Sequence, residues 1–233
     1  KTAAFALPIL QRVDLDNRSV QALVLCPTRE LTAQVAREVR TLGRCYNGLK
    51  VLELCGGQPG RPQREALERG VHIVIGTPGR LLDHLDRGSL DPASIMTLVL
   101  DEADRMLDMG FGDEVRKVVG EMPSSRQTAL FSATFPAAIE DMIRSFQRDA
   151  LRVTIDTPEK SVLDIRQLRI CVDREHKLDA LCWLLATNPH ESALVFCNQK
   201  AAVAQVTNTM DTAGVSVDRL DGDLDQFHRD QVL

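Results

Sequence analysis

Residues 97–104 read Thr97-Leu98-Val99-Leu100-Asp101-Glu102-Ala103-Asp104. A short apolar run that ends in a polar turn predicts a buried parallel β-strand. Open α/β sheets bind ligands at the carboxyl ends of their strands, where Asp101 and Glu102 would lie. Two carboxylates there can divide the work of nucleotide hydrolysis, one holding Mg²⁺ and the other orienting or deprotonating the attacking water. A solvated acidic turn is the alternative for this segment taken alone.

Apolar runs of the same kind recur along the chain, with amphipathic stretches between them. The strand candidates are Ala22–Cys26, Val51–Leu54, His72–Ile75, Thr97–Leu100, Thr128–Phe131 and Leu151–Ile155. Between the first two, Leu31, Val35, Val39 and Leu42 repeat at three- and four-residue intervals, which indicates one face of a helix. Further helix candidates are Arg80–Arg87, Asp113–Gly120 and Pro136–Phe146. This alternation predicts a mostly parallel sheet with helices on both faces.

A change in composition predicts two domains. Residues 156–165 begin with a polar, proline-containing stretch that has little to bury, and this stretch is typical of a linker. It would separate a first domain, residues 1–155, from a second, residues 166–233. In the second domain the alternation restarts, with helices at Lys177–Leu185 and Ala201–Met210 and strands at Ala193–Cys197 and Val215–Leu220. This part is too short to close a sheet, so we expect the second domain to be incomplete.

Composition places the chain among ordinary globular proteins. Its 233 residues are 44% hydrophobic and 26% charged, and no apolar run approaches the roughly 20 residues that span a bilayer. The first residues lack the form of a secretory signal. The six cysteines show no C-x-x-C pair and no metal-ligand spacing. We therefore expect a reduced, cytoplasmic setting and no membrane partner.

Charge argues against bulk attraction to nucleic acid. The net charge is −5, and only 4% of the residues are aromatic, so a base-stacking platform is not expected either. Any grip on a nucleic acid must come from locally placed arginines and backbone N–H groups. Contacts of that kind go to phosphate and ribose and are indifferent to base sequence.

Several short motifs occur in a fixed order. They are Pro27-Thr28-Arg29-Glu30-Leu31, Gly56-Gly57, Thr77-Pro78-Gly79-Arg80, Asp101-Glu102-Ala103-Asp104, Ser132-Ala133-Thr134 and Gln226-x-x-Arg229. In order and approximate spacing they resemble the DEAD-box ATP-dependent RNA helicases of superfamily 2, essentially from end to end. Each string alone is weak evidence, but the ordered set is strong. The phrases at residues 25–31, 54–59 and 101–111 are most like the bacterial DbpA type.

The resemblance implies two RecA-like α/β domains, the second incomplete, that use ATP and Mg²⁺. It implies that Glu102 is the general base, that Asp101 holds Mg²⁺, partly through water, and that Lys1 contacts the β- and γ-phosphates. Thr2 would bind the metal through its hydroxyl. In the family, Lys-Thr closes a glycine-rich loop, so we expect this chain to begin inside that motif. Without the resemblance, an N-terminal Lys-Thr is equally well a frayed end.

Two hydroxyl groups follow the strand candidate Thr128–Phe131. Ser132 and Thr134 could hydrogen-bond Asp104 and sense closure of the nucleotide site. The alternative is capping of the helix that begins near Pro136, and both roles can hold together. By resemblance, these residues couple hydrolysis to RNA binding.

The remaining motifs are implied to bind the RNA backbone. In the first domain these residues are Thr28, Arg29, Gly57, Thr77, Gly79 and Arg80. In the second they are Asn198, Asp223, Gln226 and Arg229. Ordinary turn chemistry explains the glycines equally well, and Gln226 and Arg229 share a face only if a helix starts there. One residue departs from the family pattern, because Asp221 stands where a His is usual.

The function that follows is an ATP-dependent RNA helicase that couples ATP binding and hydrolysis to RNA binding and local duplex unwinding. We expect a monomer that acts on single-stranded RNA or short duplexes, with ribosomal RNA and ribosome assembly as the leading expectation for the DbpA type. The 233 residues alone should show no meaningful ATPase activity, since the later arginine-bearing motifs are not among them. Two alternatives stay open: a DNA-directed helicase or translocase, and a non-catalytic RNA clamp.

Overall fold

The computed structural model describes residues 1–155, 165–188 and 192–232. The chain divides into two units, residues 1–153 and 154–233, and each is described by itself. The predicted linker at 156–165 lies outside the described residues except for its last position. Along the described ranges, no helix is both long and apolar enough to cross a membrane.

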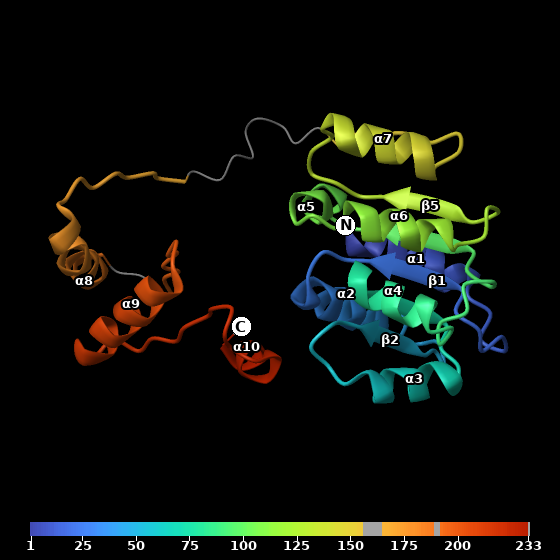
Figure 1. Ribbon diagram of the computed structural model, residues 1–233, viewed down its shortest axis with the longest axis horizontal. Coiled ribbons are helices and arrows are strands. Elements are labelled where there is room, and N and C mark those ends of the chain that lie inside the picture. Colours follow the sequence, from blue (N-terminus) through green and yellow to red (C-terminus); the bar gives the residue numbers. More distant parts are fainter. Residues whose placement is uncertain (156–164, 189–191, 233) are drawn as a thin grey trace. The chain divides into compact units, whose positions relative to one another are not determined.

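The first unit is built on a five-stranded sheet with the order β2-β3-β1-β4-β5 (Figure 1). Its strands are β1 (Ala22–Leu25), β2 (Val51–Leu54), β3 (Ile73–Gly76), β4 (Thr97–Leu100) and β5 (Gln127–Leu130). Each neighbouring pair is parallel, and Leu25 is level with both Gly76 and Leu100. All five carboxyl ends therefore meet at one edge. The parallel α/β sheet predicted from the alternation is confirmed.

Helices cover both faces of the sheet. They are α1 (Thr2–Arg12), α2 (Arg29–Leu42), α3 (Gly60–Glu68), α4 (Pro78–Asp86), α5 (Ala103–Asp108), α6 (Gly112–Gly120) and α7 (Ala137–Phe146). Helices α2, α4, α6 and α7 agree with the prediction within two residues. Helices α1, α3 and α5 are not in it, although α1 carries buried side chains at helical spacing, Phe5, Ala6, Ile9 and Leu10.

The core forms two layers, one on each side of the sheet. In β1, Leu23 and Leu25 join the cluster under α4–α7, whereas Ala22 and Val24 join the cluster under α1 and α2. This alternation is the two-residue period of a strand whose faces are both buried. Burial of both faces explains why the sequence of the strand is a continuous apolar run. The two clusters also support the carboxyl edge of the sheet.

The second unit contains a short 3₁₀ turn at Arg174–His176 and helices α8 (Lys177–Thr187), α9 (Lys200–Thr212) and α10 (Gln226–Val232). Helix α8 begins at Lys177 as predicted and ends two residues later than predicted, and α9 extends the predicted range by one residue at its start and two at its end. The start of α10 at Gln226 meets the condition under which Gln226 and Arg229 share one turn.

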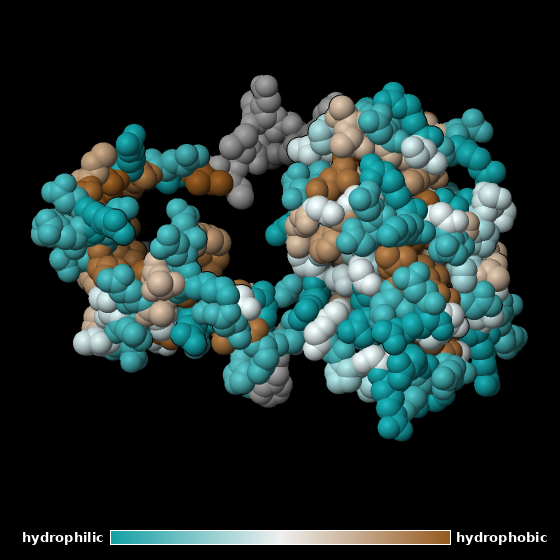
Figure 2. All heavy atoms as spheres, viewed as in Figure 1, coloured by the Kyte–Doolittle hydropathy of each residue, from teal (hydrophilic) through white to brown (hydrophobic). Residues whose placement is uncertain are grey.

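Three predicted strands are wrong. Leu151–Ile155, Ala193–Cys197 and Val215–Leu220 have no strand assignment, and Leu151, Ile155 and Leu194 are more than four-fifths exposed. Apolar sequence favours an extended backbone, but a strand also needs a hydrogen-bonded neighbour, and the described residues provide none here. Hydrophobic residues on the segment before α8, including Ile165 and Leu168, are also exposed. Figure 2 shows brown side chains along this segment.

Candidate functional site

Apart from Lys1 and Thr2, which lie at the start of α1, the predicted site residues of the first unit follow the carboxyl ends of the strands and so share one edge. The half formed by β4 and β5 carries the Asp101–Asp104 turn and Ser132–Thr134. The half formed by β2, β3 and β1 carries the loops predicted to bind RNA. Strand β1 pairs with β3 on one side and β4 on the other, so the order of the sheet reverses beside it. Such a switch point is where open α/β sheets bind ligands.

Asp101 is a buried carboxylate at this switch point, with only 2% of its surface exposed. Its backbone N–H donates to the carbonyl of Leu25 at 3.0 Å, which ties β4 to β1, and its Oδ1 accepts the N–H of Glu102 at 3.1 Å. Burial raises the pKa of Asp101, and the nearby ammonium group of Lys1 only partly opposes this. A buried anion of this kind favours a cation beside it.

Glu102 stands in a different environment, one residue on. Its backbone lies in the left-handed region, with φ 51° and ψ 53°, a conformation that costs energy in a residue other than glycine. The carboxylate is accessible and pairs with Lys1 Nζ at 4.0 Å and Arg105 Nη1 at 3.4 Å. The next N–H, that of Ala103, donates to the carbonyl of Phe131 at 3.1 Å and holds the turn against β5. Neighbouring carboxylates in unlike surroundings are suited to unlike roles.

Asp104 links this turn to the loop after β5. Its Oδ2 accepts both the hydroxyl and the N–H of Thr134, at 2.8 and 2.9 Å, and its own N–H donates to Ser132 Oγ at 3.3 Å. Partial burial raises the pKa of Asp104, but the hydrogen bonds from Thr134 outweigh it and leave the pKa below its usual value. The contact expected from the sequence is therefore present. The signalling role of these residues stays a prediction.

The residues at this end fit a Mg²⁺-bound nucleotide by their chemistry. Asp101 offers a buried carboxylate, Thr2 a hydroxyl at the start of α1, and Lys1 an ammonium group beside the acidic turn. Mg²⁺ prefers oxygen ligands and usually keeps water and substrate phosphates in its shell. No cluster of three or more His, Cys, Asp or Glu occurs in the part of the chain that the structure describes.

In the other half of the edge, Thr28 caps helix α2 by accepting the N–H of Leu31 at 3.2 Å. The guanidinium group of Arg29 packs directly over Gly57, whose φ is +78°. A Cβ at Gly57 would lie only 2.6 Å from Arg29 Cζ, so a side chain there would displace the arginine. The two motifs, far apart in sequence, thus form one unit.

The loop after β3 turns directly into α4. Thr77 is its N-cap residue, Pro78 occupies the first turn, and Gly79 is exposed to open space. Arg80 donates from Nη1 to Gln63 Oε1 at 3.2 Å and from Nη2 to the carbonyl of Gln58 at 3.0 Å. The predicted residues of β1, β2 and β3 are therefore grouped along neighbouring loops.

In the second unit, the predicted residues lie around the turn before α10. Asp223 forms an ion pair with Lys200, which is the first residue of α9. Asn198 is exposed and precedes Lys200 by two residues. Arg229 donates from Nη1 to the carbonyl of Asp221 at 3.1 Å, and the Asp221 carboxylate accepts the N–H of Asp223 at 2.9 Å. Asp221, the residue that departs from the family pattern, thus organises this turn.

The structure adds residues that the sequence prediction missed. Arg105 pairs with Glu102, Lys200 pairs with Asp223, and Gln63 holds Arg80. The spacing of Arg105, three residues after Glu102, could have indicated the first pair if a helix had been predicted there. The other two contacts join residues far apart in sequence, and no local sequence pattern predicts them.

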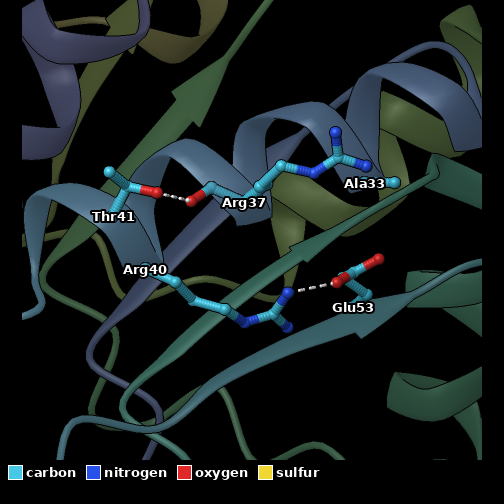
Figure 3. A pocket seen from close by; sticks show the side chains of 5 residues that line it. All are labelled: Ala33, Arg37, Arg40, Thr41 and Glu53. Atoms are coloured by element: carbon cyan, nitrogen blue, oxygen red, sulfur yellow. Dashed lines mark hydrogen bonds and ion pairs between the residues drawn. The ribbon is translucent and has the colours of Figure 1, made fainter.

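A cavity of about 430 Å³ lies elsewhere, between α2 and β2 (Figure 3). Ala33, Arg37, Arg40, Thr41 and Glu53 line it, and none of them is a predicted site residue. Arg40 forms an ion pair with Glu53 at 2.6 Å and donates to the carbonyl of Val51 at 3.0 Å. Strand β2 is an edge strand, so Arg40 covers a backbone acceptor that could otherwise pair with another chain. This cavity has a structural explanation.

Comparison with known proteins gives a consistent result. A family model described as DEAD/DEAH box helicase matches residues 1–142, and one described as helicase conserved C-terminal domain matches residues 176–233. Over all its residues the chain is 47% identical to the ATP-dependent RNA helicase DbpA of Escherichia coli (strain K12), of which it covers 51%. It is 42% identical to DeaD of the same organism and covers 37% of that protein. The chain thus spans about half the length, or less, of these curated relatives.

Solved structures agree. Saccharomyces cerevisiae Dbp5 bound to RNA and ADP BeF3 matches with a TM-score of 0.85 and 31% identity, over 99% of this chain and 58% of that one. A DEAD box protein from the hyperthermophile Methanococcus jannaschii matches with a TM-score of 0.65 and 35% identity, over 99% of this chain and 61% of that one. Together with the parallel sheet, these matches confirm the predicted RecA-like α/β fold.

Proposed function

Because the chain belongs to the DEAD/DEAH box helicase family, we propose that the protein is an ATP-dependent RNA helicase that couples ATP binding and hydrolysis to RNA binding and local duplex unwinding. One observation carries this proposal. The acidic turn after β4 joins Lys1 at the start of α1 through Glu102, and the loop after β5 through Asp104 and Thr134. A nucleotide-binding end, a candidate base and a candidate relay thus meet at one sheet edge.

The residues of this edge have distinct roles in the proposed reaction. Glu102, accessible and oriented by Arg105, takes the proton from the water that attacks the γ-phosphate. Lys1 binds phosphate oxygens, and Asp101 with Thr2 would hold the metal, partly through water. Bound Mg²⁺ would neutralise charge on the phosphate oxygens. Asp104, through Thr134 and Ser132, passes the state of the nucleotide site to the loop after β5.

The proposed RNA contacts are phosphate contacts made by the loops after β1, β2 and β3. Arg29 lies over Gly57, and Arg80 extends from the first turn of α4 beside Thr77 and Gly79. In the second unit the corresponding residues are Asn198, Asp223, Gln226 and Arg229. The similar structure of Dbp5 is bound to RNA, which supports RNA as the class of ligand. Such contacts are indifferent to base sequence.

Finer features of the proposal rest on the likeness to DbpA, at 47% identity. We propose ribosomal RNA as the target, ribosome assembly as the process, a monomer as the working form and the cytoplasm as the location. The free thiols of all six cysteines are compatible with a reducing compartment.

The test is ATP hydrolysis by the full-length protein without nucleic acid, with single-stranded RNA and with DNA of the same sequence. We expect strong stimulation by RNA only. Glu102→Gln should lower the RNA-stimulated rate at least about a hundredfold, since a general base contributes that much or more. It should leave ATP binding intact. Glu121→Gln, an exposed glutamate at the end of α6, is the matched control and should keep its activity.

Other outcomes would favour the alternative functions. Equal stimulation by DNA would indicate a DNA-directed helicase or translocase, because the 2′-hydroxyl group would then not matter. ATP-dependent RNA binding with almost no turnover, unchanged by Glu102→Gln, would indicate an RNA clamp and remove Glu102 from the mechanism.

A further inference from the structure

Among the described residues, the guanidinium group of Arg80 has no carboxylate as a hydrogen-bond partner. Its two hydrogen-bonded partners, the amide oxygen of Gln63 and the backbone carbonyl of Gln58, are both neutral. Arg40, Arg61 and Arg87, by contrast, pair with carboxylates at 2.6–2.8 Å. Arg80 makes no other hydrogen bond to the described residues, so three of its five N–H donors are left for an anion. The carboxylate of Asp83 interacts electrostatically with Arg80, but its hydrogen bond is to Arg87.

Gln63 is the centre of the arrangement. It lies in α3 and is only 5% exposed, and both the oxygen and the nitrogen of its amide form hydrogen bonds. Its Oε1 accepts from Arg80 Nη1 and from His84 Nε2, and its Nε2 donates to the carbonyl of Cys55 at 3.3 Å. A reversed amide would place N–H groups against the arginine and a carbonyl against a carbonyl. The orientation of Gln63 is therefore fixed by its neighbours.

His84 fixes Gln63 from the other side. It is buried, with 1% exposed, and its Nε2 lies 3.1 Å from Gln63 Oε1. Because that oxygen only accepts, Nε2 carries the proton, and Nδ1 faces the hydroxyl of Ser89 at 2.8 Å. Burial lowers the pKa of His84, and the charge of Arg80 lowers it further, so the ring is neutral at neutral pH.

His84 and Arg80 also share a helix. They lie one turn apart on α4, so both side chains can contact the amide of Gln63, which extends from α3. This network connects the loop after β2, which carries Gly57, to the first turn of α4, which carries Arg80.

We propose that Gln63, locked by His84 and Ser89, is a positioning residue that holds the Arg80 guanidinium group in place for an RNA phosphate without neutralising its charge. Neither Gln63 nor His84 contacts RNA in this proposal. The inference rests on the proposed RNA-binding role of Arg80 and adds the residues that make that arginine effective. Ordering the side chain before binding removes an entropic cost that RNA binding would otherwise carry.

The experiment measures the affinity of the full-length protein for a fluorescein-labelled oligouridine, with a non-hydrolysable ATP analogue, as a function of salt. Arg80→Ala should weaken binding about tenfold, as expected for one charge-assisted bond. It should also reduce the salt slope by about 0.7, the value for one phosphate contact on a single strand. Gln63→Asn, which is one methylene too short to reach, should reproduce most of both changes. For Gln63→Asn, ATPase turnover at saturating RNA should stay close to that of the unchanged protein.

A second variant separates position from charge. Gln63→Glu keeps the length of the side chain but adds an anion beside Arg80, so it should weaken RNA binding and lower the salt slope by pairing with the arginine. In the double variant Arg80→Ala/Gln63→Asn, binding should be no weaker than in Arg80→Ala alone, since the two residues act through one contact.

Gln21→Leu is the matched control. Gln21 is also a buried glutamine, 3% exposed, with three hydrogen bonds to the backbone of Asp14 and Asn17, but it precedes β1 at the opposite edge. It should lower the melting temperature without changing the salt slope. If Gln63→Asn behaves like this control while Arg80→Ala weakens binding, the positioning role is wrong. If Arg80→Ala itself leaves RNA binding unchanged, the RNA contact proposed for Arg80 is wrong, and the inference falls with it. Should Gln63→Asn fold poorly, Ser89→Ala provides the same test through the far end of the network.

Discussion

Asp101 and Glu102 are neighbours in sequence and opposites in environment. One carboxylate is buried where the backbone of β4 joins that of β1, and the other is accessible and paired with Lys1 and Arg105. The left-handed backbone at Glu102 produces this difference, because it turns the chain sharply after the strand. Strain of this kind persists only where surrounding contacts over-determine it, as the bond from Ala103 to Phe131 does here.

The burial of Asp101 leads to a prediction about stability. A raised pKa means that the folded protein disfavours the charged carboxylate, so a penalty exists above the folded pKa and is relieved as the pH falls through it. Asp101→Asn removes the charge and can still accept the N–H of Glu102. We therefore expect a higher melting temperature for the ligand-free variant at neutral pH. The additional stabilisation by Mg²⁺-ATP should disappear.

Thermal denaturation with and without Mg²⁺-ATP checks this prediction. Asp86→Asn, an exposed position in α4, should change neither quantity noticeably. A lower melting temperature for ligand-free Asp101→Asn would show that Lys1 compensates the buried charge more fully than its position suggests.

At the scale of elements, α5 and the loop after β5 are coupled through a carboxylate whose pKa is lowered. Asp104 accepts two hydrogen bonds from Thr134, and the stability that they supply is present above the unfolded pKa of about 3.9. It is lost as the pH falls through the lower, folded value. Thr134→Val removes the hydroxyl bond and should cost about 1 kcal/mol at neutral pH. The difference between the two proteins should shrink below about pH 4.

Urea unfolding at a series of pH values measures this coupling. Thr41→Val is the control, because the Thr41 hydroxyl donates to a backbone carbonyl, that of Arg37, and no carboxylate is involved. Its cost should not depend on acidity. A Thr134→Val penalty that stays constant down to the lowest pH would contradict the link between Asp104 and Thr134.

The elements also mark how far sequence reasoning reaches. Strand β4 was predictable to the residue because an apolar run between polar neighbours is a local signal, and the position of Asp101 at its carboxyl end followed from that. The contact of Thr134 with Asp104 followed in turn, since both come after parallel strands. The network around Gln63 was not predictable, because a buried glutamine carries no periodic signal. The strand predicted at Ala193–Cys197 failed because pairing depends on residues elsewhere in the chain.

At the scale of the whole molecule, the two units differ in how much they bury. The first contains two hydrophobic clusters around a sheet whose inner strands, β1, β3 and β4, are paired on both sides. Among the described residues of the second unit, Met210 alone is buried. Burial of apolar surface is the main source of stability, so the units should resist opening to very different degrees.

Hydrogen exchange of the 233-residue chain measures that difference directly. Amides of β1, β3 and β4 should exchange slowest, because each needs global opening of the first unit. Amides at 192–197 and 216–220 should exchange orders of magnitude faster, since these segments are extended and have no ladder partner among the described residues. Helix α9 should fall between, because its amides are bonded within the helix but little of it is buried. Protection at 192–197 equal to that of β1 would mean that this segment pairs as a strand after all, and the sequence prediction for it would be restored.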